Sequence, residues 1–210
     1  MIVAIDGPAG AGKSTVARGL AERLGFRYLD TGAMYRALTW LALREGVALD
    51  DAAALAALAA AHPVEFGADR SVSVDGGDVT EAIRRPEIDA AVPVVARHQA
   101  VRAVMRERQR ALAERGDSVI EGRDIGVVVV PAAEVKVWLV AAPEVRARRR
   151  HAEREGVDAA ALADELRRRD ASDAANTHRA ADAVEIDTTG LTVDAVVDRI
   201  AALVRARTAA

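Results

Sequence analysis

The sequence feature that most constrains the fold is the stretch "GPAGAGKST", residues 7–15, because of what stands on either side of it. The apolar run "IVAID" (2–6) comes directly before it and predicts a buried strand. The pattern "KSTVARGLAERLG" (13–25) overlaps its end and predicts a helix that is stopped by a glycine. The chain must therefore turn sharply from a strand into a helix through a glycine-rich loop.

This loop fits the pattern G-x-x-x-x-G-K-[ST] at Gly7, Gly12, Lys13 and Ser14. Its glycines let successive N–H groups point at phosphate oxygens, and the helix N-terminus adds a partial positive charge. A lysine ammonium can follow the β- and γ-phosphates, whereas a planar guanidinium is too bulky for a closed loop. The only other lysine is Lys136, so a lysine here indicates chemistry that requires one. The residues expected to bind the nucleotide are Gly7, Pro8, Ala9, Gly10, Ala11, Gly12, Lys13, Ser14 and Thr15.

Helical and extended patterns alternate along the chain, which is typical of an α/β fold with helices packed on a mostly parallel sheet. Further strands are expected at 26–30, 118–122, 135–140 and 183–187. Helices are expected at 32–46, 49–62, across 86–115, from about 143, and at 192–207, with Asp50 or Asp51 and Thr192 as caps. Valines alternate with polar residues around "DGG" in 64–83, which predicts a small antiparallel insert.

Composition limits the class of protein. A chain of 210 residues with 51% hydrophobic content predicts one domain. It has no apolar run of membrane-spanning length and no secretory signal, so we expect a cytoplasmic protein. We expect it to be a monomer, although composition does not determine the oligomeric state. With no cysteine and four scattered histidines, a zinc site is not expected. A net charge of −3 argues against a dedicated nucleic-acid binder.

The loop motif leaves three classes of protein open: a kinase of small substrates, a GTPase switch, and a nucleotide-driven motor or binding module. A GTPase would normally carry N-K-x-D for guanine, and neither lysine stands in such a motif. A motor ATPase is usually a longer chain and would need a strand of several apolar residues that ends in an acidic pair, which "SVIEGRD" (118–124) matches only in part. The kinase interpretation is therefore favoured.

A kinase needs a second substrate, and three segments rich in charged side chains follow or flank the expected strands and helices. "DTGAMYR" (30–36) and "EGRDIG" (121–126) each follow a strand, where a crevice opens at the carboxyl edge of a parallel sheet. "RRRDASD" (167–173) adds further arginines and carboxylates. These segments predict the binding site of an anionic acceptor.

Each of these residues also has a purely structural interpretation. Tyr35 is large enough to be a core residue, and Arg36 is compatible with the exposed face of a helix. Arg123 and Asp124 could pair only with each other. Their occurrence together at the expected sheet edge favours the acceptor site.

The segments "IDGPAGAGKST", "LDTGAMYRALT", "VRAVMRERQR", "VIEGRDIGVVVVP", "VKVWLVA", "LRRRDASD" and "IDTTGLT" together resemble the bacterial cytidylate kinase family over nearly the whole chain. The resemblance implies a three-layer P-loop NTPase fold with a five-stranded parallel sheet in a single domain, 1–210. It also implies a CMP-binding insert near 63–92 and a helical lid near 146–170. The implied reaction transfers the γ-phosphoryl group of ATP, with Mg²⁺, to CMP or dCMP.

The resemblance also implies roles for individual residues. Lys13 would contact the transferring phosphates and Ser14 would lie near Mg²⁺. Lys13, Arg123 and Arg169 would neutralise charge on the transferring group, together with lid arginines such as Arg149 or Arg154. The acceptor side would consist of Tyr35, Arg36, Arg102, Arg123, Asp124, Arg169 and Asp173.

Two positions depart from the pattern of this family. A serine that helps to bind the base is replaced by Pro93, and an arginine expected three residues after Asp173 is replaced by Asn176. Both positions lie on the implied acceptor side. The departures therefore concern acceptor affinity rather than donor binding.

Overall fold

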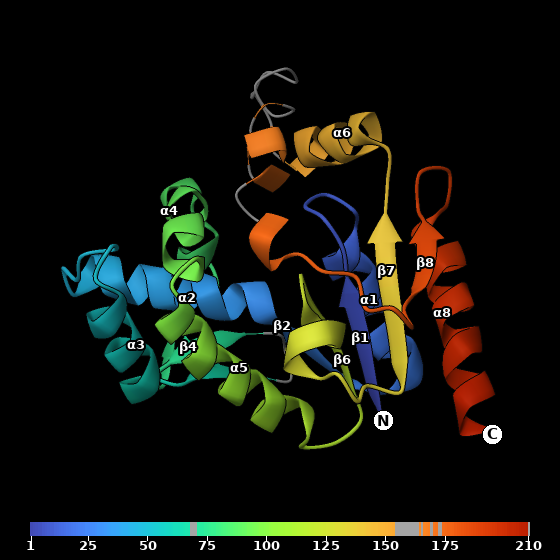
Figure 1. Ribbon diagram of the computed structural model, residues 1–210, viewed down its shortest axis with the longest axis horizontal. Helices are drawn as coiled ribbons and strands as arrows, with labels where there is room; N and C mark the ends of the chain where they lie inside the picture. The colour runs from blue at the N-terminus through green and yellow to red at the C-terminus, as the bar shows by residue number, and fades with distance from the viewer. Residues whose placement is uncertain (68–70, 154–163, 165, 169, 172–173, 210) are drawn as a thin grey trace. The chain divides into compact units, whose positions relative to one another are not determined.

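The computed structural model describes residues 1–67, 71–153, 164, 166–168, 170–171 and 174–209 (Figure 1). The chain divides into two compact units, which are described separately. The first unit consists of Met1–Leu29 and Ala113–Ala210, and the second consists of Asp30–Leu112.

The first unit is built on a sheet whose strand order is β2-β6-β1-β7-β8. The strand that precedes the glycine-rich loop is central: β1 pairs in parallel with β6 on one side and with β7 on the other, and β8 pairs in parallel with β7. The predicted α/β class and five-stranded parallel sheet are confirmed. The strands are β1 (Ile2–Asp6), β2 (Arg27–Asp30), β6 (Ser118–Gly122), β7 (Val135–Val140) and β8 (Val184–Asp187).

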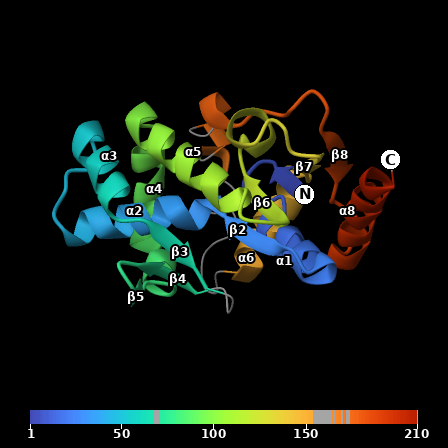
Figure 2. The ribbon, with the colours of Figure 1, turned by 90° about the horizontal axis from the view of Figure 1, so that it is seen from below.

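One face of this sheet is covered by two helices, α1 (Lys13–Leu24) and α8 (Val193–Thr208). The two helices lie side by side when the molecule is seen from below (Figure 2). Their apolar side chains, among them Leu20 and Ile200, share one buried core with Ile5 and Leu139 of the sheet. Burying these side chains fixes the start of α1 against the end of β1. The unit also contains η2 (Ile125–Val129), which is a π-helical turn, α6 (Pro143–Glu153) and the short 3₁₀ helix η3 (Ala174–Asn176).

The second unit combines helices with a small sheet of order β3-β4-β5, whose strands pair antiparallel. Asp75 and Gly76 connect β4 to β5 with positive φ angles of 53° and 75°, which suits the "DG" pair of a tight hairpin. The predicted antiparallel insert is therefore present. The elements are α2 (Thr31–Arg44), α3 (Ala52–Ala61), β3 (Val64–Phe66), β4 (Val72–Val74), β5 (Gly77–Asp78), η1 (Ala82–Arg84), α4 (Pro86–Ala96) and α5 (Gln99–Ala113).

Three helices begin at polar side chains that cap them: α2 and α8 begin within one residue of the predicted start, and α3 begins at Ala52 rather than at residue 49. The helical stretch predicted across 86–115 is two helices, α4 and α5. The carboxylates of Asp30 and Asp51 accept the N–H groups of Ala33 and Ala54 at the starts of α2 and α3. Thr192 caps α8 in the same way, as predicted. In the part of the chain that the structure describes, no helix is both long and apolar enough to cross a membrane.

Candidate active site

The glycine-rich loop leaves the carboxyl end of β1 under tight steric constraint. Gly7 has a φ of 150°, and a Cβ atom there would lie 2.2 Å from the carbonyl oxygen of Leu139 in the neighbouring strand. Gly10 has a φ of 74°, and a Cβ atom there would lie 3.0 Å from the Cβ atom of Arg146. Any side chain at Gly7 would push β1 and β7 apart, so these glycines are required by packing as well as by backbone conformation.

The helix that follows the loop differs from the capped helices. Gly12 is the N-cap of α1, and among the described residues no side chain accepts a hydrogen bond at this end. The first turn of α1 also carries no acidic residue. The N–H groups of this turn therefore keep their partial positive charge for an external acceptor. An anion such as a phosphate is the group that such an end binds.

Lys13 and Ser14 begin α1 beside this cradle. The Nζ atom of Lys13 donates to the carbonyl oxygen of Pro8 at 2.8 Å, so the ammonium is folded back over the loop. Ser14 is exposed, and a hydroxyl oxygen is a ligand that Mg²⁺ accepts when phosphate oxygens and water complete its octahedron. The described residues include no cluster of three or more acidic or histidine side chains that could hold a metal by itself. The site therefore fits a magnesium ion that arrives with a nucleotide.

Asp6, the last residue of β1, was not singled out by sequence reasoning. Its side chain is 3% exposed, and its two carboxylate oxygens accept the N–H groups of Ile125 and Gly126, each at 2.8 Å. Burial raises the pKa of this carboxyl from 3.8 to about 6, against the lowering effect of the two N–H groups and of Lys13. The carboxylate thus holds the "GRDIG" segment beside the start of the glycine-rich loop, residues 7–15, which is called the phosphate loop below.

Arg123 and Asp124 lie in this fixed segment. The Nη1 atom of Arg123 donates to the carbonyl oxygen of Gly7 at 2.9 Å, which places its guanidinium at the first residue of the loop. Asp124 is 7% exposed, and its carbonyl oxygen accepts the first N–H bonds of η2. The N–H group of His178 donates to the carbonyl oxygen of Arg123, so the segment just after η3 lies against the "GRDIG" segment. The structure therefore brings Arg123 and the phosphate loop together.

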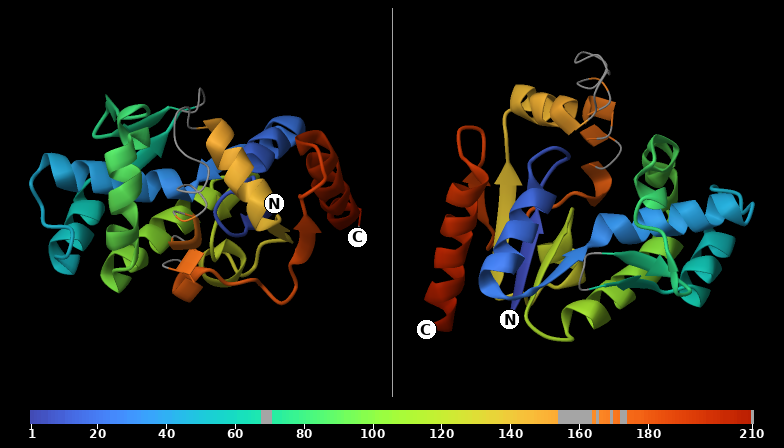
Figure 3. Two further views of the ribbon diagram at one scale, coloured as in Figure 1. Left: turned by 90° about the horizontal axis from the view of Figure 1, so that it is seen from above. Right: turned by 180° about the vertical axis from the view of Figure 1, so that it is seen from behind.

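Two arginines of α6 also contact the phosphate loop. Arg146 donates to the carbonyl oxygen of Ala9 at 2.9 Å, and Arg149 donates to that of Ala11 at 3.4 Å. Seen from above, α6 crosses over the loop that leads into α1 (Figure 3). Arg149, which was expected among the arginines around the transferring phosphoryl group, is thus bound to the loop backbone in this structure.

The remaining expected acceptor residues that the structure describes belong to the second unit. Tyr35 and Arg36 are half-buried in the first turns of α2, and the Nη2 atom of Arg36 lies 3.0 Å from a carboxylate oxygen of Asp30. The Nε atom of Arg36 is buried, with no hydrogen-bond partner among the described residues. Arg102 is half-buried in α5. Neither Tyr35 nor Arg36 is a core residue, and Arg36 is not on an open helix face.

Several predictions fall on residues that the structure does not describe. Arg169 and Asp173 lie outside the described residues, as do Arg154 and the rest of 154–163 in the expected lid. The two departures from the family pattern are described: Pro93 lies inside α4, and Asn176 ends η3.

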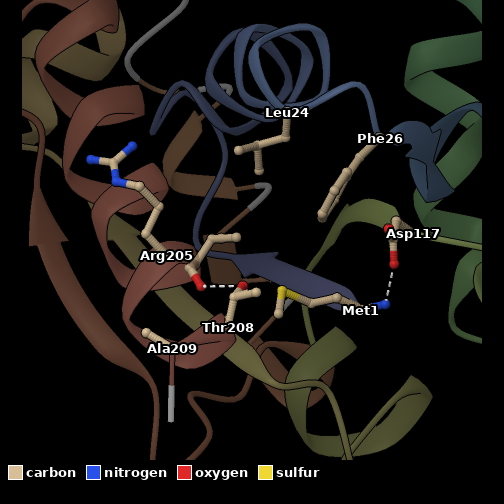
Figure 4. A pocket seen from close by; sticks show the side chains of 8 residues that line it. Met1, Leu24, Phe26, Asp117, Arg205, Thr208 and Ala209 are labelled. Carbon is tan, nitrogen blue, oxygen red and sulfur yellow. Dashed lines mark hydrogen bonds and ion pairs between the residues drawn. The ribbon is translucent and has the colours of Figure 1, made fainter.

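A cavity of about 640 Å³ lies at the opposite end of the strands from the phosphate loop. Figure 4 shows it between the start of β1 and the ends of α1 and α8, with Met1, Leu24 and Phe26 on its wall. Two of its polar groups are paired: the amino group of Met1 bonds to Asp117, and the Thr208 hydroxyl donates to the carbonyl oxygen of Val204 in its own helix. Because the cavity lies at the other end of the strands from the glycine-rich loop, it is not the candidate phosphate site.

A sequence model of the cytidylate kinase family matches residues 3–206. The chain belongs to the cytidylate kinase family. It is 50% identical to the cytidylate kinase of Geobacillus sp. (strain WCH70), with 98% of this chain and 96% of that one covered. It is 49% identical to that of Pelotomaculum thermopropionicum, with coverage of 97% and 96%. The shikimate kinase of Bacteroides thetaiotaomicron has a TM-score of 0.51 at 17% identity, covering 98% of both chains, and shows the fold alone.

Proposed function

We propose that this chain is a cytidylate kinase, which transfers the γ-phosphoryl group of ATP to CMP or dCMP and releases ADP with CDP or dCDP, in pyrimidine nucleotide metabolism. The observation that carries the proposal is that the chain is 50% identical to a named cytidylate kinase over 98% of its length. The uncapped N-terminus of α1, directly after the glycine-rich loop, is consistent with it. We further propose that it works as a monomer in the cytoplasm.

On the donor side, the loop residues from Gly7 to Thr15 would hold the ATP phosphates through backbone N–H groups. Lys13 would leave the Pro8 carbonyl and follow the β- and γ-phosphates, an exchange that replaces a neutral acceptor by a charged one. Ser14 would hold Mg²⁺, which supplies neutralisation of charge on the β- and γ-oxygens when it is bound.

On the acceptor side, we propose that Arg123 meets the acceptor phosphate, because its guanidinium already lies at the first residue of the loop. Tyr35, Arg36 and Arg102 would bind the rest of the nucleotide, together with the insert near 63–92. The buried Nε atom of Arg36 supports this role, because a buried donor is stabilised by a ligand acceptor. Asp124, Arg169 and Asp173 would complete the acceptor site.

Phosphoryl transfer leaves the protein mainly the work of positioning and charge neutralisation. The attacking phosphate of CMP is already anionic, so the proposed reaction requires no general base. Lys13, Arg123 and Arg169 would neutralise charge on the transferring group. Closure of a lid near 146–170 would exclude water and so limit hydrolysis of ATP.

The proposal is tested by a coupled ADP-release assay on purified protein with a panel of acceptors. CMP and dCMP should support rapid ADP release in the presence of Mg²⁺, and UMP should be at least about tenfold poorer in kcat/KM. Shikimate and gluconate serve as controls for the shared fold. Activity on shikimate, gluconate or AMP with none on CMP would refute the proposed acceptor. It would not contradict the proposed role of the glycine-rich loop in binding ATP.

A further inference from the structure

Arg146 and Arg149 of α6 contact the phosphate loop in a regular way. They bind the carbonyl oxygens of alternate residues, Ala9 and Ala11, which lie in the middle of the loop. Both contacts run from a charged donor to a neutral backbone acceptor. The Arg146 contact, at 2.9 Å, has the length of a charge-assisted bond. The Arg149 contact is longer, at 3.4 Å, and the Ala11 carbonyl also accepts from the Thr188 hydroxyl, to which Arg149 donates.

Each contact sets the direction of a peptide plane. In a trans peptide, the carbonyl of one residue and the N–H of the next point in opposite directions. Holding the Ala9 carbonyl toward α6 therefore turns the N–H of Gly10 away from α6. The Ala11 carbonyl does the same for the N–H of Gly12. The loop residues that follow the two carbonyls are both glycines, whose backbone would otherwise be free to rotate.

Both guanidinium groups are held from a second side. Arg146 also pairs with Asp170 at 2.7 Å, with its side chain 12% exposed. Arg149 donates to the hydroxyl and the carbonyl oxygens of Thr188, at 2.9 and 2.8 Å, and Thr188 is buried after β8. These second contacts restrict the conformation of each arginine side chain, so the guanidinium groups are held in position to donate to the loop carbonyls.

We propose that Arg146 and Arg149 are positioning residues for the donor nucleotide, which hold the Ala9 and Ala11 carbonyls so that the phosphate-binding N–H groups of the loop stay aimed at the ligand. This inference rests on the proposed function only for the identity of the donor. The arginines act through the loop and not on the transferring phosphoryl group.

Positioning the loop and acting on the transferring phosphoryl group differ in which ligands they affect. ADP lacks the γ-phosphate but occupies the N–H groups of the loop, so loss of loop order weakens ADP and ATP together. A residue that acts only on the transferring group leaves ADP affinity unchanged and lowers kcat. The KM for CMP stays constant in the positioning role, because the acceptor does not use these N–H groups.

The experiment measures ADP affinity by isothermal titration calorimetry for wild type, Arg146→Gln and Arg149→Gln, with steady-state kinetics on each. We expect the Kd for ADP and the KM for ATP to rise by about tenfold in each variant, with the KM for CMP within twofold of wild type. Arg148→Gln is the matched control, because Arg148 is an exposed residue of the same helix and its loss removes the same charge. It should leave ADP affinity within twofold of wild type. Arg146→Lys, which keeps a cationic donor, should recover most of the affinity.

Unchanged ADP affinity in both glutamine variants would overturn the inference, as would an equal loss in Arg148→Gln, which would indicate a general effect of charge. Thermal unfolding of each variant identifies any loss that comes from the fold. A wild-type chain that binds ADP but leaves CMP unphosphorylated would refute the proposed acceptor and not the role of the two arginines.

Discussion

The buried carboxylate of Asp6 should make the stability of this protein depend on pH in an unusual direction. Its pKa is raised from 3.8 to about 6, chiefly because burial disfavours the charged form. The folded protein therefore holds this proton more tightly than the unfolded chain does. The stabilisation is fully present below pH 3.8 and is lost as the pH rises through about 6.

The size of the effect follows from the shift itself. A shift from 3.8 to about 6 corresponds to about 3 kcal/mol in the free energy of unfolding, and most of this should appear between pH 4 and pH 7.5. No reduction for solvent screening is needed, because Asp6 is 3% exposed. The substitution Asp6→Asn removes the titration while nearly keeping the volume of the side chain.

Urea unfolding of the wild type and Asp6→Asn without nucleotide, followed by circular dichroism at several pH values, measures this contribution. The wild type should lose about 3 kcal/mol relative to the variant as the pH rises across that interval. Other carboxyl groups cancel in the difference. Asp187 gives a comparison in which stability changes with pH in the opposite direction. Its pKa is lowered, chiefly by the hydrogen bond from the Thr189 side chain. The stabilisation that Asp187 contributes is therefore present above pH 3.8 and is lost at lower pH. A difference between wild type and Asp6→Asn that stays constant with pH would show that the Asp6 carboxyl titrates normally.

Substitutions at three further positions test the proposed roles of site residues. Lys13→Ala should cost about 3 kcal/mol or more of transition-state stabilisation, and Lys13→Arg should be nearly as poor for steric reasons; turnover within tenfold of wild type in a coupled assay would contradict the role of the ammonium. Asn176→Arg should lower the KM for CMP and leave that for ATP unchanged, because it restores a cation beside the loop of Arg123; an unchanged KM for CMP would indicate that another arginine already binds the acceptor. Asp124→Ala should shrink the preference for CMP over UMP mainly by slowing CMP, and an unchanged ratio of the two kcat/KM values would mean that Asp124 has no part in base choice.

The elements of this fold were predictable where the sequence pattern is strong and local. The apolar runs at 2–6, 118–122 and 135–140 became β1, β6 and β7 with the expected bounds, because each is buried in the sheet. The "DGG" turn and the caps Asp51 and Thr192 also follow from side-chain chemistry within a few residues. Periodicity and capping are local effects, and the sequence displays them directly.

The contacts that complete the phosphate loop were not predictable in this way. Asp6 meets N–H groups about 120 residues further along the chain, and Arg149 meets Ala11 across a similar distance in sequence. An acidic residue at the end of a strand, or an arginine in an Arg-rich helix, gives no local sign of such a partner. Only the structure identifies Asp6 as a site residue, through its burial. Burying a carboxylate costs free energy, and here two backbone N–H groups offset part of that cost.

These long-range contacts explain how a loop of mostly glycine and alanine can be rigid enough to bind phosphate. Its glycines and alanines supply almost no side-chain contacts, so its order must come from the Lys13 ammonium and from groups outside the loop. Arg123 holds the carbonyl of Gly7, while Arg146 and Arg149 hold those of Ala9 and Ala11. Lys13 donates to the carbonyl of Pro8. Cations thus bind four carbonyls of the loop, and the same cations make the surrounding potential favourable for the phosphates that we propose its N–H groups bind.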